Sequence, residues 1–244
     1  MGAALASASS TAPVVEKFDG VHVVRDDLFP GGTKARFLPL IFEGVTELVY
    51  ASPCEGGAQT ALATVAANLG KRATIFIAKR AVPHPRGLMA KRLGAAVYQV
   101  SPGYLSVVRA RAKAYAAAHG ATLAPFGINL PEAATVISAA ARSTGIKPDE
   151  VWCASGSGVL ARALALAFPD ARRHVVQIGR TLTPMEVAGA EIHVHPLKFE
   201  QALKARPPFP SDPHYDAKAW ELAARRASPG KTVLFWNVTG PATP

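Results

Sequence analysis

The sequence predicts an α/β fold in which mainly parallel sheets are flanked by helices. Two observations lead to this prediction: short apolar runs rich in β-branched residues recur along the chain, and alanine-rich stretches with helical periodicity lie between most of them. Such alternation is typical of parallel strands joined by helical crossovers. With 244 residues, 49% of them hydrophobic, the chain is long enough for one sizeable domain or for two lobes.

The predicted elements follow in chain order. Strands are expected at 21–24, 47–52, 73–78, 95–101, 150–155, 174–179, 191–195 and 232–238, and helices at 58–69, 86–93, 104–119, 131–143, 157–167 and 216–227. Residues 206–216 ("RPPFPSDPHYD") contain too much proline for either element, which predicts an ordered crossing loop. Residues 1–13 lack the basic start and apolar centre of a signal peptide and are predicted to form a disordered arm. Since no apolar run reaches the roughly 18 residues of a membrane helix, no membrane partner is expected.

Positive charge is concentrated in one third of the chain. Between residues 45 and 125 there are ten cations and two acids, Glu47 and Glu55, a net +8 of the chain's +10. The cations are Lys71, Arg72, Lys79, Arg80, Arg86, Lys91, Arg92, Arg109, Arg111 and Lys113. A solvated surface usually mixes both signs, so this segment predicts a polyanionic partner or a strongly anionic substrate.

Cysteine and histidine usage limits the redox and metal chemistry that the sequence predicts. Cys54 and Cys153 are the only cysteines, which indicates no disulfide framework and favours a reducing cytoplasm. His193 and His195 in "IHVHP" share one face of a predicted strand. Because no third ligand is close to them in sequence, no metal site is predicted.

Three segments combine a strand end, glycines and a helix start, where α/β folds commonly bind ligands. They are "FPGGTK" (29–34), "ASPCEGGAQT" (51–60) and "CASGSGVLARAL" (153–164). In the third, backbone N–H groups at the helix start could hold an anion that the glycines allow to come close. A tight turn without a ligand is one alternative. A nicotinamide-binding GxGxxA loop is another, although the next strand ends without an acid to hold a ribose.

Taken together and in this order, the motifs resemble pyridoxal-phosphate enzymes of the tryptophan-synthase-β type, known as fold type II. "PGGTKARFL" is similar to the segment that carries the Schiff-base lysine in the aminocyclopropane-carboxylate deaminase and D-cysteine desulfhydrase branch. "EGGAQTALATVAANLGKRATIFI" resembles the substrate-loop helix and the next strand, "ASGSGVL" the phosphate loop, and "LFWNVTG" the closing strand. The resemblance implies a two-lobed enzyme, with a large cofactor-binding lobe from 14–44 and 125–244 and a smaller basic lobe from 45–124.

The resemblance also implies a role for individual residues. Lys34 would be the catalytic lysine that binds pyridoxal 5'-phosphate. The phosphate would be held by Ser155, Gly156, Ser157 and Gly158, and substrate contacts would come from Gly57, Thr60 and Arg36. Thr239 would face the ring nitrogen, and a hydroxyl at that place leaves the nitrogen less fully protonated. Gln59 would contact the cofactor near the place where the family usually has an asparagine for the ring's phenolic oxygen.

One further resemblance concerns the substrate. "PSDPHYDAKAWELAARRASPGKTVLFWNVTG" is similar to short fold type II proteins of bacteriophages that hypermodify thymine in their DNA, a modification that evades restriction. This implies a DNA-binding decarboxylase of an amino-acid-modified thymidine, of the glycinyl-thymidine to aminoethyl-deoxyuridine type, in the host cytoplasm. Two alternatives stay open: a deaminase or desulfhydrase of a free small amino acid, and a non-catalytic basic nucleic-acid-binding protein. Whether two copies form a homodimer is also open.

Overall fold

The computed structural model describes residues 11–101 and 103–242, which form two compact units. Of the described residues, unit 1 contains those within 34–128, and unit 2 contains 11–33 and Asn129–Pro241. Residues 34–44, which the sequence assigns to the larger lobe, therefore belong to unit 1. Of the arm predicted at 1–13, residues 1–10 lie outside the described part of the chain.

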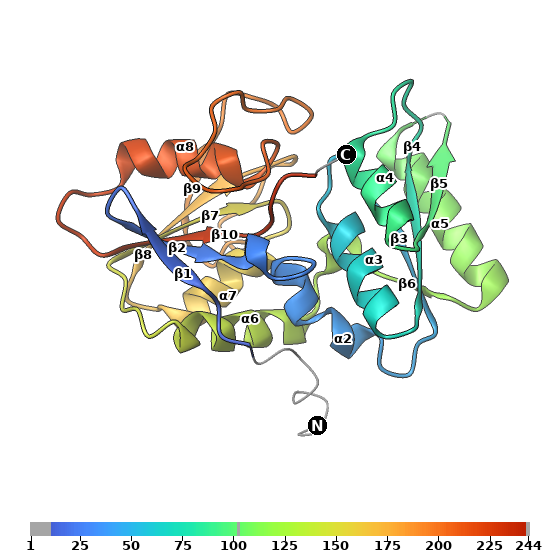
Figure 1. The fold of residues 1–244 in the computed structure, drawn as a ribbon, viewed down its shortest axis with the longest axis horizontal. Helices are drawn as coiled ribbons and strands as arrows, with labels where there is room; N and C mark the ends of the chain where they lie inside the picture. The colour runs from blue at the N-terminus through green and yellow to red at the C-terminus, as the bar shows by residue number, and fades with distance from the viewer. Residues whose placement is uncertain (1–10, 102, 243–244) are drawn as a thin grey trace. The chain divides into compact units, whose positions relative to one another are not determined.

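Unit 2 is built on a six-stranded sheet with the order β1-β2-β10-β7-β8-β9 (Figure 1). Its strands are β1 (Val15–Phe18), β2 (Val21–Arg25), β10 (Val233–Asn237), β7 (Glu150–Ser155), β8 (Arg172–Gln177) and β9 (Glu191–Val194). Only the β1–β2 hairpin is antiparallel among these pairs. Every residue of β7 and of β10 is buried, as expected of central strands covered on both faces.

Helices cover both faces of the unit 2 sheet. Helix α8 (Asp216–Arg226) lies on one face, and α7 (Val159–Ala167) with α6 (Pro131–Ser143) lies on the other (Figure 1). The α8 face contains a core of large side chains that includes Trp152, Trp220 and Phe235. The crossing loop at 206–216 is irregular up to the start of α8, and Phe209 anchors it in this core.

Unit 1 is built on a four-stranded parallel sheet with the order β5-β4-β3-β6. Its strands are β3 (Glu47–Ala51), β4 (Arg72–Ala78), β5 (Ala96–Val100) and β6 (Thr122–Leu123), and its main helices are α3 (Ala58–Asn68), α4 (Pro85–Arg92) and α5 (Leu105–His119). On β4, Phe76 packs on Tyr115 of α5 while the adjacent Ile77 meets Gly87 of α4. Because successive side chains of a strand point to opposite faces, α4 and α5 cover opposite faces of this sheet.

The two sheets, one parallel and one mainly parallel, confirm the predicted α/β class. Each of the eight predicted strands is present, and the structure adds β1 and the two-residue β6. It also adds short helical turns, namely η1 (Asp26–Leu28), η2 (Thr33–Arg36), α2 (Leu38–Ile41) and η3 (Phe126–Ile128). Within the described residues, none of the helices has both the length and the apolar character needed to cross a membrane.

Candidate active site

The glycine turn before Lys34 is fixed to the end of β10. Gly32 has φ +69°, and a Cβ at this position would lie 2.4 Å from the carbonyl oxygen of Val238, so only glycine allows this approach. The next residue, Thr33, donates its N–H to the same oxygen at 3.1 Å. Its hydroxyl donates to Asp26 at 2.7 Å and accepts the indole N–H of Trp236 at 2.9 Å. The backbone that leads into Lys34 is therefore held rigidly in unit 2.

Lys34 is the first residue of unit 1 and lies in the single turn η2. Its side chain is half-buried, whereas Arg36, two residues later, is only 1% exposed. The catalytic role predicted for Lys34 and the substrate contact predicted for Arg36 both stay predictions.

The Ser-Gly loop joins β7 to α7, and its two glycines are explained by neighbouring backbone. A Cβ at Gly158, which has φ +81°, would lie 2.1 Å from the carbonyl oxygen of Glu186, and one at Gly156 would lie 3.2 Å from that of Ile178. The Gly158 N–H donates to the Ser155 hydroxyl at 2.9 Å. Neighbouring backbone thus accounts for both glycines, and the phosphate contacts predicted for Ser155, Gly156 and Gly158 stay predictions. Half-buried Ser157 and the remaining amides at the start of α7 still present donors and a positive helix end.

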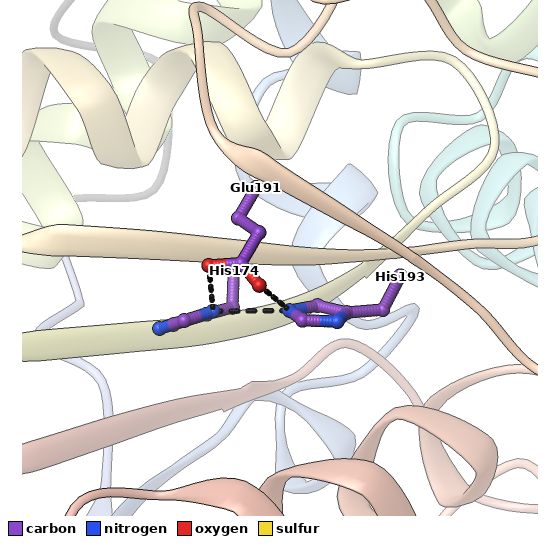
Figure 2. Close-up of side chains that lie close together, drawn as sticks. All are labelled: His174, Glu191 and His193. Carbon is purple, nitrogen blue, oxygen red and sulfur yellow. Dashed lines mark hydrogen bonds and ion pairs between the residues drawn. The ribbon is translucent and has the colours of Figure 1, made fainter.

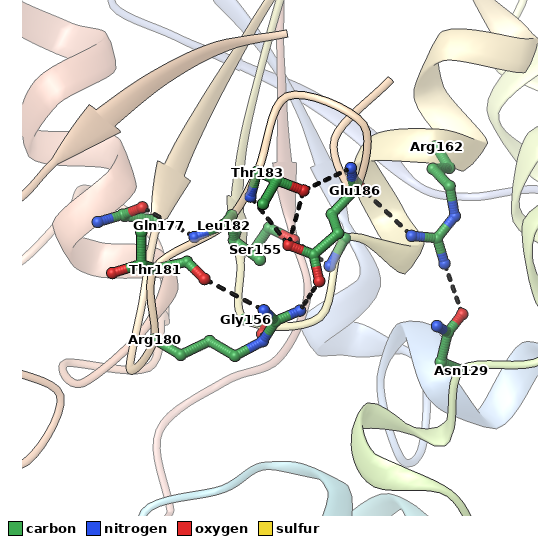
Figure 3. Close-up of polar contacts among 11 residues, drawn as sticks. Asn129, Ser155, Gly156, Arg162, Gln177, Arg180, Thr181, Leu182, Thr183 and Glu186 are labelled. Atoms are coloured by element: carbon green, nitrogen blue, oxygen red, sulfur yellow. Dashed lines mark hydrogen bonds and ion pairs between the residues drawn. The ribbon is translucent and has the colours of Figure 1, made fainter. Parts of the chain in front are cut away.

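The segment from Arg180 to Glu186 braces this loop (Figure 3). Arg180 donates from Nε to the Gly156 carbonyl at 3.1 Å and pairs with the Glu186 carboxylate. That carboxylate also accepts the Thr183 N–H at 2.8 Å. The hydrogen bond from Arg180, helped by Thr183, lowers the pKa of Glu186 to about 2. A second guanidinium, that of Arg162 in α7, donates to the Glu186 carbonyl at 3.0 Å.

A buried carboxylate that the sequence analysis did not single out lies beside Thr239. Asp216, the first residue of α8, is 0% exposed and accepts the Thr239 N–H at 3.2 Å. The preceding Tyr215 packs against Gly156, since its hydroxyl lies 3.8 Å from the position of a Cβ there. Burial, followed by the negative charge of Asp216, raises the pKa values of Tyr215 and of Cys153, so both groups stay protonated and neutral. Tyr215 and Asp216 thus bring the Ser-Gly loop and Thr239 together.

The contact predicted between Thr239 and the ring nitrogen stays a prediction, and Asp216 adds a charge beside it. A lone hydroxyl at Thr239 predicts weak protonation of that nitrogen, whereas a carboxylate next to it favours the protonated, cationic form. Asp216 was missed because an acid in the first turn of a predicted helix is usually explained by the helix dipole.

In the loop at 51–60 of unit 1, the side-chain amide of Gln59 is bound within the turn. Gln59 is 0% exposed, and its Nε2 donates to the carbonyls of Pro53 and Cys54 at 2.8 Å each. Both amide hydrogens are used within the turn, and the cofactor contact predicted for Gln59 stays a prediction. The substrate contacts predicted for Gly57 and Thr60 remain untested; the Thr60 hydroxyl donates to the Gly57 carbonyl at 3.1 Å at the start of α3.

The residues of unit 2 fit pyridoxal phosphate at both of its polar ends. The Asp216 carboxylate is an acceptor suited to a cationic ring nitrogen, and the start of α7 with Ser157 offers donors to a phosphate. The two ends are linked through Tyr215, which contacts Gly156 and directly precedes Asp216.

Comparisons with known proteins agree with this fit. The family model described as "Pyridoxal-phosphate dependent enzyme" matches residues 21–231. Similar solved structures include an "ACC deaminase homologue" (18% identity, TM-score 0.81, 98% of this chain and 94% of that chain). The T.th. threonine deaminase (15%, 0.71, 98% and 97%) and the Escherichia coli diaminopropionate ammonia lyase (15%, 0.67, 97% and 85%) share the fold as well. A search of curated proteins finds no match. The matched region covers most of the chain, and the protein is therefore a member of the pyridoxal-phosphate-dependent enzyme family.

Proposed function

We propose that the protein is a pyridoxal-phosphate-dependent lyase that decarboxylates an amino acid carried on thymidine in DNA. The observation that carries the DNA part of this proposal is the charge exposed by unit 1. Both acids of the segment 45–125 are buried, Glu47 at 3% and Glu55 at 8% exposure. The part of this segment that meets solvent therefore displays cations without acidic neighbours from the same segment.

Eight of the ten cations contribute to this surface. Arg72 is neutralised by Glu47 at 2.8 Å, and Arg86 is 2% exposed. The others are exposed or half-buried, namely Lys71, Lys79, Arg80, Lys91, Arg92, Arg109, Arg111 and Lys113. A free small amino acid does not require such a field, whereas a nucleic acid does, because each neutralised phosphate releases counterions.

The chain's own residues provide the remaining chemistry. When bound, pyridoxal phosphate draws electrons from one bond at the substrate Cα. The start of α7 with Ser157 would hold the phosphate, and the Asp216 carboxylate would keep a proton on the ring nitrogen. Lys34 would bind the cofactor through Nζ and, once displaced by the substrate amine, would hold a proton there. In the decarboxylation, the Cα–carboxylate bond breaks, carbon dioxide leaves, and the Cα takes up one proton.

The test of the DNA substrate is the salt dependence of binding to a fluorescent duplex, measured by anisotropy. Replacement of three α5 cations in one variant, Arg109→Gln, Arg111→Gln and Lys113→Gln, should weaken binding. It should also reduce the slope of log K against log salt by up to about 2.7, or 0.9 per lost phosphate contact. The matched control removes three exposed cations of unit 2, Lys198→Gln, Lys204→Gln and Arg206→Gln, and should leave the slope nearly unchanged. Equal losses in both variants, or no binding at low salt, would refute the DNA part.

The second candidate is a deaminase or desulfhydrase of a free small amino acid. It is favoured by the solved structures of similar fold, among which are an ACC deaminase homologue and a threonine deaminase. Release of keto acid from D-cysteine, serine or aminocyclopropane carboxylate by the purified protein, without DNA, would support this candidate over decarboxylation.

A further inference from the structure

Three side chains from the neighbouring strands β8 and β9 converge on the α8 face of the unit 2 sheet (Figure 2). His174 Nδ1 lies 3.0 Å from His193 Nε2, and each of these nitrogens lies 3.6 Å from an oxygen of Glu191. The parallel register pairs His174 with Glu191 and Val176 with His193. Because alternate residues of paired strands share a face, this register places all three side chains on one side of the sheet.

The triangle of donor atoms has nearly the size that a tetrahedral zinc ion requires. Zn–N bonds of about 2.0–2.1 Å at tetrahedral angles put two donor atoms about 3.3–3.4 Å apart. The observed separations of 3.0 Å and 3.6 Å lie on either side of this value. Two imidazoles and one carboxylate are also a donor set that zinc commonly binds, with the fourth position left to water.

The two imidazoles are held in place by packing. The rings of His174 and His193 stack on the indole of Trp152, with centroid distances of 4.1 Å and 4.9 Å. They are 4% and 7% exposed, so the surrounding core holds both rings in place. The Glu191 side chain is exposed and can turn towards an ion without disturbing the core.

A proton on His193 Nε2 occupies the place that a metal would take, and Arg226 keeps it there from the other side of the ring. Arg226 Nη1 donates to His193 Nδ1 at 3.1 Å, and since arginine can only donate, that nitrogen must accept. The proton of His193 then lies on Nε2 and points at His174 Nδ1. Metal binding at Nε2 would shift this proton to Nδ1 and expel Arg226, which is exposed on α8 and can move. Arg172, which pairs with Glu191 at 2.8 Å, is a second competing cation.

We propose that His174, Glu191 and His193 form a binding site for a divalent transition-metal ion of the zinc class, which ties the edge strand β9 to β8. The site is separate from the candidate active site, because it lies beside the end of α8 that carries Arg226, whereas Asp216 and Thr239 lie at its beginning. The proposed site also differs from the histidine pair noted in the sequence, His193 and His195. His195 is bound instead by Glu221 at 2.8 Å and by the Leu197 N–H at 3.1 Å.

Calorimetric titration of the chelator-treated, cofactor-loaded protein with Zn²⁺ tests the site. Wild type should bind one equivalent that is lost in His193→Ala and weakened at least about 100-fold in Glu191→Gln. The second variant keeps the test valid if the first fails to fold, because Glu191 is exposed. Arg226→Gln should bind about 10-fold more tightly. At 100 times the dissociation constant, zinc should raise the Tm of wild type by roughly 5–10 °C.

His119→Ala is the matched control, since His119 is exposed on α5 of unit 1, and it should bind zinc like wild type. The proposal is overturned if wild type takes up no more zinc than His193→Ala does. It is also overturned if Glu191→Gln binds zinc as tightly as wild type, which would leave the two imidazoles as a hydrogen-bonded pair only.

Discussion

Replacement of Gly32 by alanine should break the contact between the turn before Lys34 and the end of β10 and so destabilise the protein. The new Cβ would lie 2.4 Å from the Val238 carbonyl oxygen, about 1.0 Å inside the 3.4 Å at which ordinary contact begins, so the turn and the end of β10 must separate. The Thr33 N–H to Val238 bond, now 3.1 Å, would then open and leave a buried donor unpaired, at about 1–3 kcal/mol. A left-handed φ of +69° adds about 1–2 kcal/mol for any L side chain. The expected loss in the free energy of unfolding is therefore about 2–5 kcal/mol.

Gly20→Ala is the matched control for this substitution. Gly20 has a similar φ of +83° in the same unit, but nothing lies within 4 Å of its ideal Cβ, so only the conformational cost of about 1–2 kcal/mol applies. Urea unfolding followed by circular dichroism gives both values, and the absorbance of bound cofactor reports the position of Lys34. Equal destabilisation by the two substitutions, with normal cofactor loading in both, would refute the reasoning.

Other substitutions test single side chains. Asp216→Asn keeps the size of the side chain and the acceptor for the Thr239 N–H but removes the charge. The cofactor should still bind, while turnover falls roughly 100-fold. Unchanged turnover would exclude a role for Asp216 at the ring nitrogen. Gln59→Met should cost about 1–3 kcal/mol of stability in urea unfolding, because the Cys54 carbonyl loses the Gln59 donor, whereas the Pro53 carbonyl keeps the Gly56 N–H and the Ser52 hydroxyl. Intact stability with loss of cofactor would instead support Gln59 as a ligand. The pKa of Glu186 is depressed to about 2 in the folded state, so its stabilisation is complete above about pH 4.5 and is lost as the pH falls towards 2. Melting curves of Glu186→Gln should therefore depend less on pH than those of wild type over this range, and parallel profiles would contradict the assignment.

The sequence predicts the fold well because hydrophobic periodicity is a local property. The largely apolar runs at 150–155 and 232–238 form the buried strands β7 and β10, whereas β6 is only two residues long and leaves no periodic signal. The glycine-containing loops also predicted the correct family and cofactor, because their composition and their order along the chain can both be read from the sequence.

The details of the candidate site depend on contacts that chain order does not reveal. The partner of Gly158 is the carbonyl of Glu186, which lies 28 positions away, and the charge beside Thr239 comes from Asp216 on another element. The hydrogen bonds from Gln59 to Pro53 and Cys54 could not be predicted, because they require a specific geometry of the turn at 53–59. The His174–Glu191–His193 cluster was missed for a similar reason, since the parallel pairing of β8 and β9 supplies the third side chain.

The attachment of the cofactor to one lysine is the central claim, and borohydride treatment of the purified protein tests it most directly. Reduction makes the link between a lysine amine and the cofactor aldehyde permanent, so digestion and mass spectrometry locate the modified residue. The predicted result is a visible absorbance that borohydride abolishes, a pyridoxyl group on Lys34, and neither signal in Lys34→Ala. A colourless protein, or a label on a different lysine, would contradict the account.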